Sequence, residues 1–205
     1  MAEVDSLAIK GELLALLCKK SVFQGNFTLA SGAQSDLYID ARLTTLDPRG
    51  AQLIGALGWQ LIKERRGQTG SAVNAIGGLT LGADPVALGI GIAARADDPA
   101  NQLQVFTVRK TAKTHGRNKL IEGNFREGDT VVIVDDVITS GGSALQAVAA
   151  VEQAGGHVAF ILVLVDREEG GREKIEAAGH QVISIFGRSD LIAREVAQAR
   201  AEAMP

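Results

Sequence analysis

Short runs of apolar and β-branched residues alternate along the chain with longer segments that have helical periodicity. The strand-like runs cover residues 72–76, 102–108, 130–134, 158–165 and 181–186. Helical patterns cover about 47–67, 84–94 and 142–154, a segment that ends near Gly179, and a C-terminal segment. Strands that alternate with helices favour a parallel sheet with helices packed against it. The sequence therefore predicts a single α/β domain spanning residues 1–205.

The N-terminal region has a different pattern. Helical periodicity covers about 6–20, and residues 26–40 then alternate around a Ser31-Gly32 turn, with Leu37 and Ile39 on one face. Period-two alternation around a turn predicts a β-hairpin. Residues 1–45 are thus expected to form a small subdomain of a helix and a hairpin, packed against the main sheet.

Several helix starts are marked by capping residues. Asp47-Pro48 and Asp84-Pro85 each place an aspartate before a proline, and Ser189 precedes the C-terminal helical pattern. Aspartate and serine cap the first N–H groups of a helix, and proline suits its first position. The glycine-rich segment Gly77–Gly82, between the strand at 72–76 and the Asp84 helix, is expected to be a loop.

The composition, 46% hydrophobic and 22% charged, is typical of a soluble globular domain. A net charge of −3 disfavours general nucleic-acid binding. The longest strongly apolar run, 158–165, is strand-sized, so no membrane segment is expected. The single cysteine, Cys18, excludes an intrachain disulfide, and the acidic Glu3 and Asp5 are unlike a signal peptide, so a cytoplasmic location is expected.

Positive charge is concentrated between Arg109 and Lys119, where five cations occur without an acid. A basic run of this kind is usually a solvated face or a nonspecific polyanion surface. Beside a site for an anionic ligand, the basic run instead favours a lid that closes over the ligand.

Residues 130–143 carry the most informative chemical pattern. An apolar strand leads into Asp135 and Asp136, and a loop of small and hydroxyl-bearing residues then leads into a helix. The N–H groups at a helix start favour a phosphate, while two carboxylates at a strand end suit vicinal hydroxyls and a nearby Mg²⁺. An isolated Asp pair would more often cap a loop, but the complete strand-to-helix pattern favours a ligand site.

This segment is neither a Walker A loop nor a dinucleotide-binding glycine motif. It resembles the ribose-phosphate-binding signature of the type I phosphoribosyltransferases. That resemblance implies that Asp135 and Asp136 hold the ribose hydroxyls of phosphoribosyl pyrophosphate (PRPP). It also implies that the following residues bind the 5′-phosphate: Val137, Ile138, Thr139, Ser140, Gly141, Gly142 and Ser143.

Three other segments resemble the orotate phosphoribosyltransferases in particular. Residues 109–116 are similar to their mobile catalytic loop, residues 27–38 to their N-terminal hairpin, and Asp166-Arg167-Glu168 to the segment whose arginine meets the orotate carboxylate. The resemblance implies the type I phosphoribosyltransferase fold, with residues 1–45 forming part of a hood over the base. It also implies Mg²⁺-dependent transfer of the phosphoribosyl group from PRPP to N1 of orotate, which yields orotidine 5′-monophosphate and pyrophosphate for pyrimidine biosynthesis.

Individual roles follow from the same resemblance. Lys113, His115, Asp135 and Asp136 are expected to be catalytic, and the two aspartates to lie near Mg²⁺ that is held through substrate oxygens or water. Further PRPP contacts are expected from Arg109, Lys110, Leu79, Thr80, Leu81 and Gly82, and orotate contacts from Tyr38, Ile39, Thr139 and Arg167. A homodimer with shared active sites is implied, in which the Lys110–Gly123 loop reaches the partner's site.

Two positions depart from the family pattern, because Ala30 and Leu81 stand where some members have lysine. Phosphate contacts at residues 79–82 must then come mainly from backbone N–H groups. Two alternatives share the Asp135–Ser143 segment. A purine or uracil phosphoribosyltransferase would need a different base-binding region, and a PRPP-sensing regulator would tend to lose the lid lysine and histidine and gain a DNA-binding extension.

Overall fold

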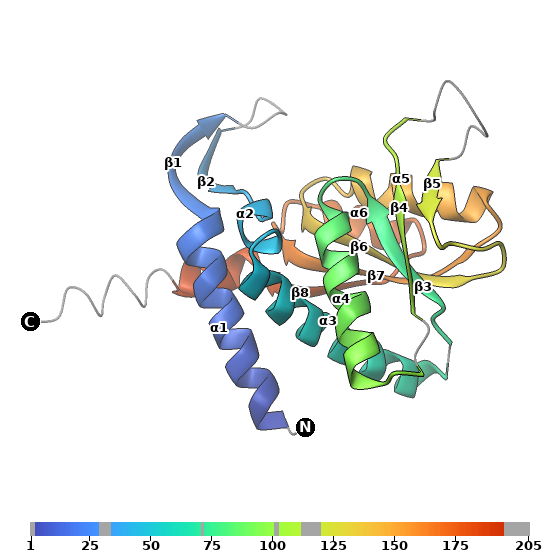
Figure 1. Ribbon diagram of the computed structural model, residues 1–205. Coiled ribbons are helices and arrows are strands. Elements are labelled where there is room, and N and C mark those ends of the chain that lie inside the picture. The colour runs from blue at the N-terminus through green and yellow to red at the C-terminus, as the bar shows by residue number, and fades with distance from the viewer. Residues whose placement is uncertain (1–2, 29–33, 71, 101–102, 112–119, 195–205) are drawn as a thin grey trace, which may run out of the picture.

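The computed structural model describes residues 3–28, 34–70, 72–100, 103–111 and 120–194 (Figure 1). Its main sheet has six strands in the order β5-β4-β3-β6-β7-β8. The bounds are β3 Ala75–Leu79, β4 Gln104–Val108, β5 Ile121–Gly123, β6 Thr130–Ile138, β7 His157–Asp166 and β8 Val182–Gly187. The predicted α/β fold is confirmed, with one correction: β5 pairs antiparallel with β4, so the sheet is mixed rather than fully parallel.

Helices cover both faces of this sheet and form two separate apolar cores. Side chains of α1 (Glu3–Ser21), α3 (Pro48–Thr69) and α4 (Ala83–Asp97) pack with Val132 and Val134. Side chains of α5 (Gly142–Gln153) and α6 (Gly171–Ala177) pack with Val131 and Ile133 on the opposite face. Successive side chains of a strand point to opposite faces, so the continuous apolar run of β6 supplies both cores.

The predicted N-terminal hairpin forms its own two-stranded sheet. Its strands are β1 (Val22–Thr28) and β2 (Gln34–Ile39), so it begins directly after α1 rather than at residue 26. Leu37 and Ile39 are buried, as the alternation predicts, while Tyr38 is half exposed. A one-turn helix, α2 (Arg42–Thr45), follows and was not predicted. The expected Ser31-Gly32 turn lies outside the described residues.

Only one of the three predicted caps has the expected form. Asp47 accepts a hydrogen bond from the Gly50 N–H at 2.9 Å, and α3 continues beyond Gly67 to Thr69. Asp84 lies inside α4, which begins at Ala83, so its prediction as the cap is wrong. The prediction for Ser189 is also wrong, because residues 188–194 are already helical and its hydroxyl donates to Glu168.

β3 lies three residues later in the chain than predicted and β6 is four residues longer, and both differences bring the backbone toward the same end of the sheet. Gly77 and Gly78 belong to β3 rather than to a loop, because β4 and β6 lie too close to admit side chains there. A Cβ on Gly77 would overlap the Phe106 carbonyl, and one on Gly78 the Val134 carbonyl. β6 continues through Ile138, because β7 pairs with it up to Asp166, whereas its pairing with β3 ends at Ile133.

In the part of the chain that the structure describes, no helix has the length and apolar character that crossing a membrane requires.

Candidate active site

A cavity of about 590 Å³ opens at the carboxyl ends of β3, β6 and β7, beneath the segment that joins β2 to α2. The chain leaves β3 for β4 on one side and later returns to β6 on the other. The boundary between β3 and β6 is therefore the topological switch point of the sheet, where ligands of open α/β sheets bind. Predicted site residues from five separate segments meet there.

The acid pair forms the floor of the cavity. Asp135 is 6% exposed, and both carboxylates line the cavity. The Asp136 N–H donates to Asp135 Oδ1 at 3.0 Å, and the Val137 N–H donates to Asp136 Oδ1 at 2.9 Å. Burial and the charge of Asp136 raise the pKa of Asp135 to about 8, and burial also raises the pKa of Asp136. Two carboxylates held this way favour ligands that donate hydrogen bonds or carry positive charge.

The loop after β6 presents hydroxyl groups and a helix start to the same cavity. Thr139, Ser140 and Ser143 line it. Gly141 has a φ of 74° and stands immediately before α5, which has no side-chain cap. A glycine is required at this position because its φ is left-handed and a Cβ would contact the Gly171 carbonyl at 2.8 Å. The uncapped N–H groups and the hydroxyls form a suitable site for a phosphate.

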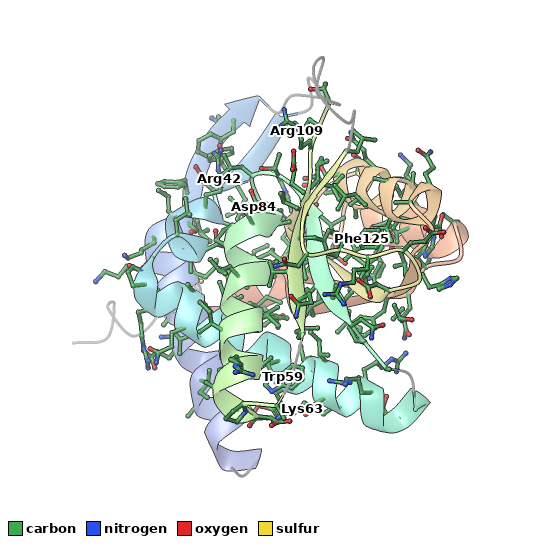
Figure 2. The ribbon with its side chains drawn as sticks, turned by 45° about the vertical axis from the view of Figure 1, so that its right-hand side comes forward. Arg42, Trp59, Lys63, Asp84, Arg109 and Phe125 are labelled. Carbon is green, nitrogen blue, oxygen red and sulfur yellow. The ribbon has the colours of Figure 1, made fainter. Side chains whose placement is uncertain are left out.

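Residues 79–82 form the second backbone loop of the cavity. Asp84 accepts hydrogen bonds from the hydroxyls of Thr80 at 2.6 Å and Thr107 at 2.5 Å, so it ties this loop to β4. Figure 2 labels Asp84 on α4. Gly82 lies against Asp136, and a Cβ there would overlap the carboxylate. The sequence pattern indicated this loop. It did not indicate that Asp84 anchors the loop, because that depends on its contact with Thr107 of β4.

Arg167 is 5% exposed and lines the cavity from the end of β7. Its N–H donates to the Ile138 carbonyl at 3.0 Å, which continues the pairing of β6 and β7. Its guanidinium Nη2 lies 2.8 Å from Glu169 Oε1 and 3.4 Å from the Leu37 carbonyl of β2. The three other residues predicted to contact orotate, Tyr38, Ile39 and Thr139, line the same cavity.

The remaining predicted residues have different positions. Lys110 lines the cavity, and its carbonyl accepts a hydrogen bond from Gln146. Arg109, at the end of β4 (Figure 2), lies outside the lining and 3.9 Å from Glu122. Ile138 is buried in the core, and Gly141 and Gly142 shape the start of α5 without lining the cavity. Lys113 and His115 lie outside the described residues.

Asp40 and Arg42 also line the cavity, from the β2–α2 connection, although the sequence patterns did not indicate them as site residues. Arg42 donates from Nε and Nη2 to the Asp40 carboxylate at 2.8 and 2.9 Å, and this contact lowers the pKa of Asp40. The hydrogen bond to Asp40 raises the pKa of Arg42, with a smaller contribution from the charge of Asp136. Their only sequence signal was the hairpin pattern that ends at Asp40.

The donor set fits a magnesium ion that is bound mainly through other molecules. Among the described residues, no group of three or more His, Cys, Asp or Glu side chains could hold a metal. Asp135 and Asp136 do offer carboxylate oxygens, and their pKa values are raised mainly by burial. Mg²⁺ is commonly bound by one or two carboxylates together with substrate phosphates and water.

Comparison with known proteins decides the family. The phosphoribosyl transferase domain model matches residues 85–185. The chain is 44% identical over 191 residues to orotate phosphoribosyltransferase of Mycobacterium leprae, with 93% of this chain and 98% of that protein covered. The chain belongs to the orotate phosphoribosyltransferase family.

Solved structures of this orotate phosphoribosyltransferase family agree with that assignment. The Mycobacterium tuberculosis H37Rv enzyme in complex with Fe(III) dicitrate has a TM-score of 0.75 and 42% identity, covering 89% of this chain and 98% of that chain. The same enzyme in complex with PRPP has a TM-score of 0.69 and 36% identity, covering 90% and 92%. The family and transferase activity inferred from the sequence motifs are confirmed.

Proposed function

We propose that this member of the family transfers the phosphoribosyl group of PRPP to N1 of orotate, producing orotidine 5′-monophosphate and pyrophosphate for pyrimidine biosynthesis. One observation carries the proposal: the acid pair of β6, the hydroxyl loop before α5 and Arg167 of β7 all line a single cavity. These groups match the ribose, the phosphate and the carboxylate of the two substrates.

The 5′-phosphate of PRPP is assigned to the start of α5. Thr139, Ser140 and Ser143 supply hydroxyl donors, and the helix supplies free N–H groups and the positive end of its dipole. Gly141 and Gly142 would contribute backbone rather than side chains. Val137, between this loop and the acid pair in the chain, also lines the cavity and is proposed to contact PRPP.

The diphosphate is assigned to the loop 79–82 and the basic segment. Leu79, Thr80, Leu81 and Gly82 would offer backbone N–H groups, because Leu81 has no charge to contribute. Lys110 adds a cation at the cavity, and Lys113, His115 and Arg109 are proposed to join it when substrate binds. Their positive charges would stabilise the departing pyrophosphate, which gains negative charge as the glycosidic bond breaks.

Asp135 and Asp136 are proposed to accept hydrogen bonds from the two ribose hydroxyls. Mg²⁺, held through substrate oxygens and water near this pair, would supply charge neutralisation for the leaving group. The carboxylates orient the ribose while the transition state acquires oxocarbenium character. Closure of the basic segment over the cavity would exclude water that would otherwise compete with orotate.

The base is assigned to the space between Arg167 and the hairpin. A guanidinium can make two parallel hydrogen bonds to a planar carboxylate, which orotate has and uracil lacks. Tyr38, Ile39 and Thr139 line the cavity on the same side. Residues 1–45 would thus cover the base, with β2 held to Arg167 through the Leu37 carbonyl.

A homodimer with shared active sites is also proposed, in which the basic loop after β4 reaches the partner's cavity. The observation that favours it is a set of exposed apolar side chains: Leu43, Leu46 and Leu81 line one open hollow, and together with Leu88 and Ile92 they are each between 48% and 62% exposed. Leu88 and Ile92 are four residues apart on α4 and therefore share one face. Exposed apolar side chains of this kind favour a protein partner.

A mixed-dimer assay would test the shared site. One subunit carries Lys113→Ala and the other carries Asp135→Asn with Asp136→Asn, so each homodimer is inactive while a mixed dimer has one intact site. Recovered activity on mixing supports sharing, and a mixture that stays inactive contradicts it. A cytoplasmic location is proposed as well, since Cys18 is buried and a second cysteine is absent from the sequence.

The substrate assignment is tested by following orotate consumption with PRPP and Mg²⁺, with adenine, hypoxanthine and uracil as competing bases. Turnover of orotate, with little turnover of the other bases, is the expected result. Turnover with another base alone would contradict the assignment and favour a purine or uracil phosphoribosyltransferase.

A further inference from the structure

The turn after β7 places a buried cation beside an acid that reaches solvent. Arg167 is almost fully buried, whereas the side chain of Glu169, 2.8 Å from its Nη2, is 32% exposed. A buried guanidinium is costly unless a counter-charge accompanies it. Glu169 provides that counter-charge from outside the cavity, because it does not belong to the cavity lining.

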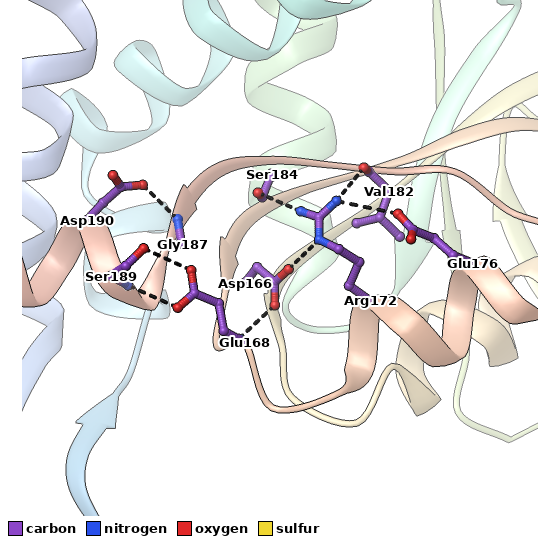
Figure 3. A network of polar contacts seen from close by, with 9 residues as sticks. All are labelled: Asp166, Glu168, Arg172, Glu176, Val182, Ser184, Gly187, Ser189 and Asp190. Atoms are coloured by element: carbon purple, nitrogen blue, oxygen red, sulfur yellow. Dashed lines mark hydrogen bonds and ion pairs between the residues drawn. The ribbon is translucent and has the colours of Figure 1, made fainter.

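The backbone around this pair is anchored by a separate polar network (Figure 3). Asp166 accepts a hydrogen bond from the Glu168 N–H at 2.9 Å and another from Arg172 Nε at 2.8 Å. The Glu168 carboxylate accepts the Ser189 hydroxyl at 2.9 Å. Gly187 leaves room for this carboxylate, since a Cβ there would overlap Glu168 Oε1.

Glu168 also has a φ of 57°, which is uncommon for a residue with a side chain. Contacts on both sides of the turn hold this conformation, and the carboxylate of Glu168 is occupied by Ser189 rather than by Arg167. The Arg167 backbone is therefore fixed by its neighbours. The Glu169 side chain can leave the guanidinium by rotating about its own bonds, without a change in the backbone of the turn.

We propose that Glu169 competes with the carboxylate of the base for the Arg167 guanidinium and so sets the affinity for the base. It neutralises the guanidinium in the empty site and is displaced when the base binds. This inference rests on the proposed function, which assigns the orotate carboxylate to Arg167. A carboxylate that enters exchanges one anionic partner of Arg167 for another. When the product leaves, Glu169 returns, so the buried cation keeps an anionic partner throughout the cycle.

The exchange lowers the affinity for every ligand that carries the carboxylate and leaves other ligands unaffected. Orotidine 5′-monophosphate retains the carboxylate of orotate, so Glu169 would also favour its release. Uridine 5′-monophosphate has the same ribose phosphate and pyrimidine without the carboxylate, and it serves as the matched probe. A purely structural Glu169 would change the binding of both nucleotides alike.

The experiment measures the dissociation constants of both nucleotides by isothermal titration calorimetry. Glu169→Gln should lower the constant for orotidine 5′-monophosphate by roughly threefold to tenfold, as expected for an ion pair with one partly exposed member. The constant for uridine 5′-monophosphate should not change. Glu169→Asp keeps the charge on a shorter side chain, so it should lower the dissociation constant for orotidine 5′-monophosphate less than Glu169→Gln. It also controls for a folding effect specific to glutamine.

Glu176→Gln is the matched control, because Glu176 also pairs with an arginine, Arg172 at 3.6 Å, but outside the cavity. It should alter neither constant. Orotidine 5′-monophosphate binding that is unchanged or weaker in Glu169→Gln would overturn the proposal, and so would equal tightening of both nucleotides.

Arg167→Ala separates this proposal from the function on which it depends. If Arg167→Ala weakens only the carboxylate-bearing nucleotide, the base assignment stands, and Glu169→Gln should then have no effect in that background. If Arg167→Ala leaves both constants unchanged, the base assignment itself is wrong. Weakening by Arg167→Ala without tightening by Glu169→Gln rejects the Glu169 proposal alone.

Discussion

The carboxyl ends of β6 and β7 lie side by side, and each contains an almost fully buried aspartate. Asp166 of β7 is 3% exposed and pairs with Arg172, which also donates to the Val182 carbonyl and the Ser184 hydroxyl of β8. Asp135 of β6 is 6% exposed, yet within the described residues its charge has no ion-pair partner. Asp166, whose charge is neutralised, stabilises the fold. Asp135, whose charge is not, remains available to a ligand but lowers stability.

The difference follows from the position of each strand. β8 is an edge strand and α6 follows β7 directly, so an arginine of α6 can reach Asp166. β6 is central, and the two loops beside its end supply backbone N–H groups and hydroxyls to the cavity rather than a neutralising partner for Asp135. The comparison predicts that substitutions at the end of β6 affect activity, while those at Asp166 affect stability.

The largest expected effect is on catalysis at β6. Asp135→Asn combined with Asp136→Asn should lower kcat on the order of 100-fold or more, because the groups proposed to orient the ribose and to lie near Mg²⁺ lose their charge. Steady-state kinetics with PRPP and orotate would measure it, with circular dichroism as the control for folding. A fall in kcat below threefold would mean that the pair is not part of the catalytic site.

Arg167→Ala should have the next largest effect. Loss of a charge-assisted hydrogen bond costs on the order of 1.5–3 kcal/mol, so affinity for orotate should fall roughly 10- to 150-fold. Affinity for PRPP should change much less, and the preference for orotate over uracil should decline. An unchanged preference in steady-state kinetics with both bases would show that Arg167 is not the carboxylate ligand.

Substitution of Asp166 tests the other half of the comparison. Asp166→Asn should lower the free energy of unfolding by about 1–3 kcal/mol, because Arg172 keeps its charge without its buried partner. A chain of this length then loses roughly 2–4 °C in Tm for each kcal/mol. Calorimetry would measure the Tm. Activity at a temperature well below it should remain near wild type, and a large loss of kcat in the folded variant would contradict a purely stabilising role.

The sequence predicted most of the fold and most of the cavity because both depend on local patterns. The strand at 130–134 and the acid pair are adjacent in the chain, so their relation is visible in the sequence. β5 has three residues, α2 has four, and neither contains enough periodic positions to identify it. The contacts of Asp84 with Thr107 and of Arg167 with Leu37 join distant segments, so tertiary packing alone determines them.

A further prediction concerns stability against pH at the end of β6, in the absence of metal and substrate. Burial and the charge of Asp136 raise the pKa of Asp135 in the folded chain to about 8, against about 3.9 in an unfolded chain. Between these two values the folded state binds the proton that the unfolded state has released. The contribution of Asp135 to stability therefore falls as the pH rises toward 8, by at most about 1.4 kcal/mol per pH unit.

Asp135→Asn removes this dependence and should therefore stabilise the chain more at pH 8 than at pH 5, as measured by urea unfolding at each pH. Asp40→Asn is the control within the same cavity. Its hydrogen bond to Arg42 lowers the pKa of Asp40, so its contribution is present at neutral pH and is lost as the pH falls. That variant should lose more stability at pH 8 than near pH 3. If the stability difference between Asp135→Asn and wild type is equal at pH 5 and pH 8, Asp135 is ionised in the empty site, and the contrast with Asp166 does not arise from an uncompensated buried charge.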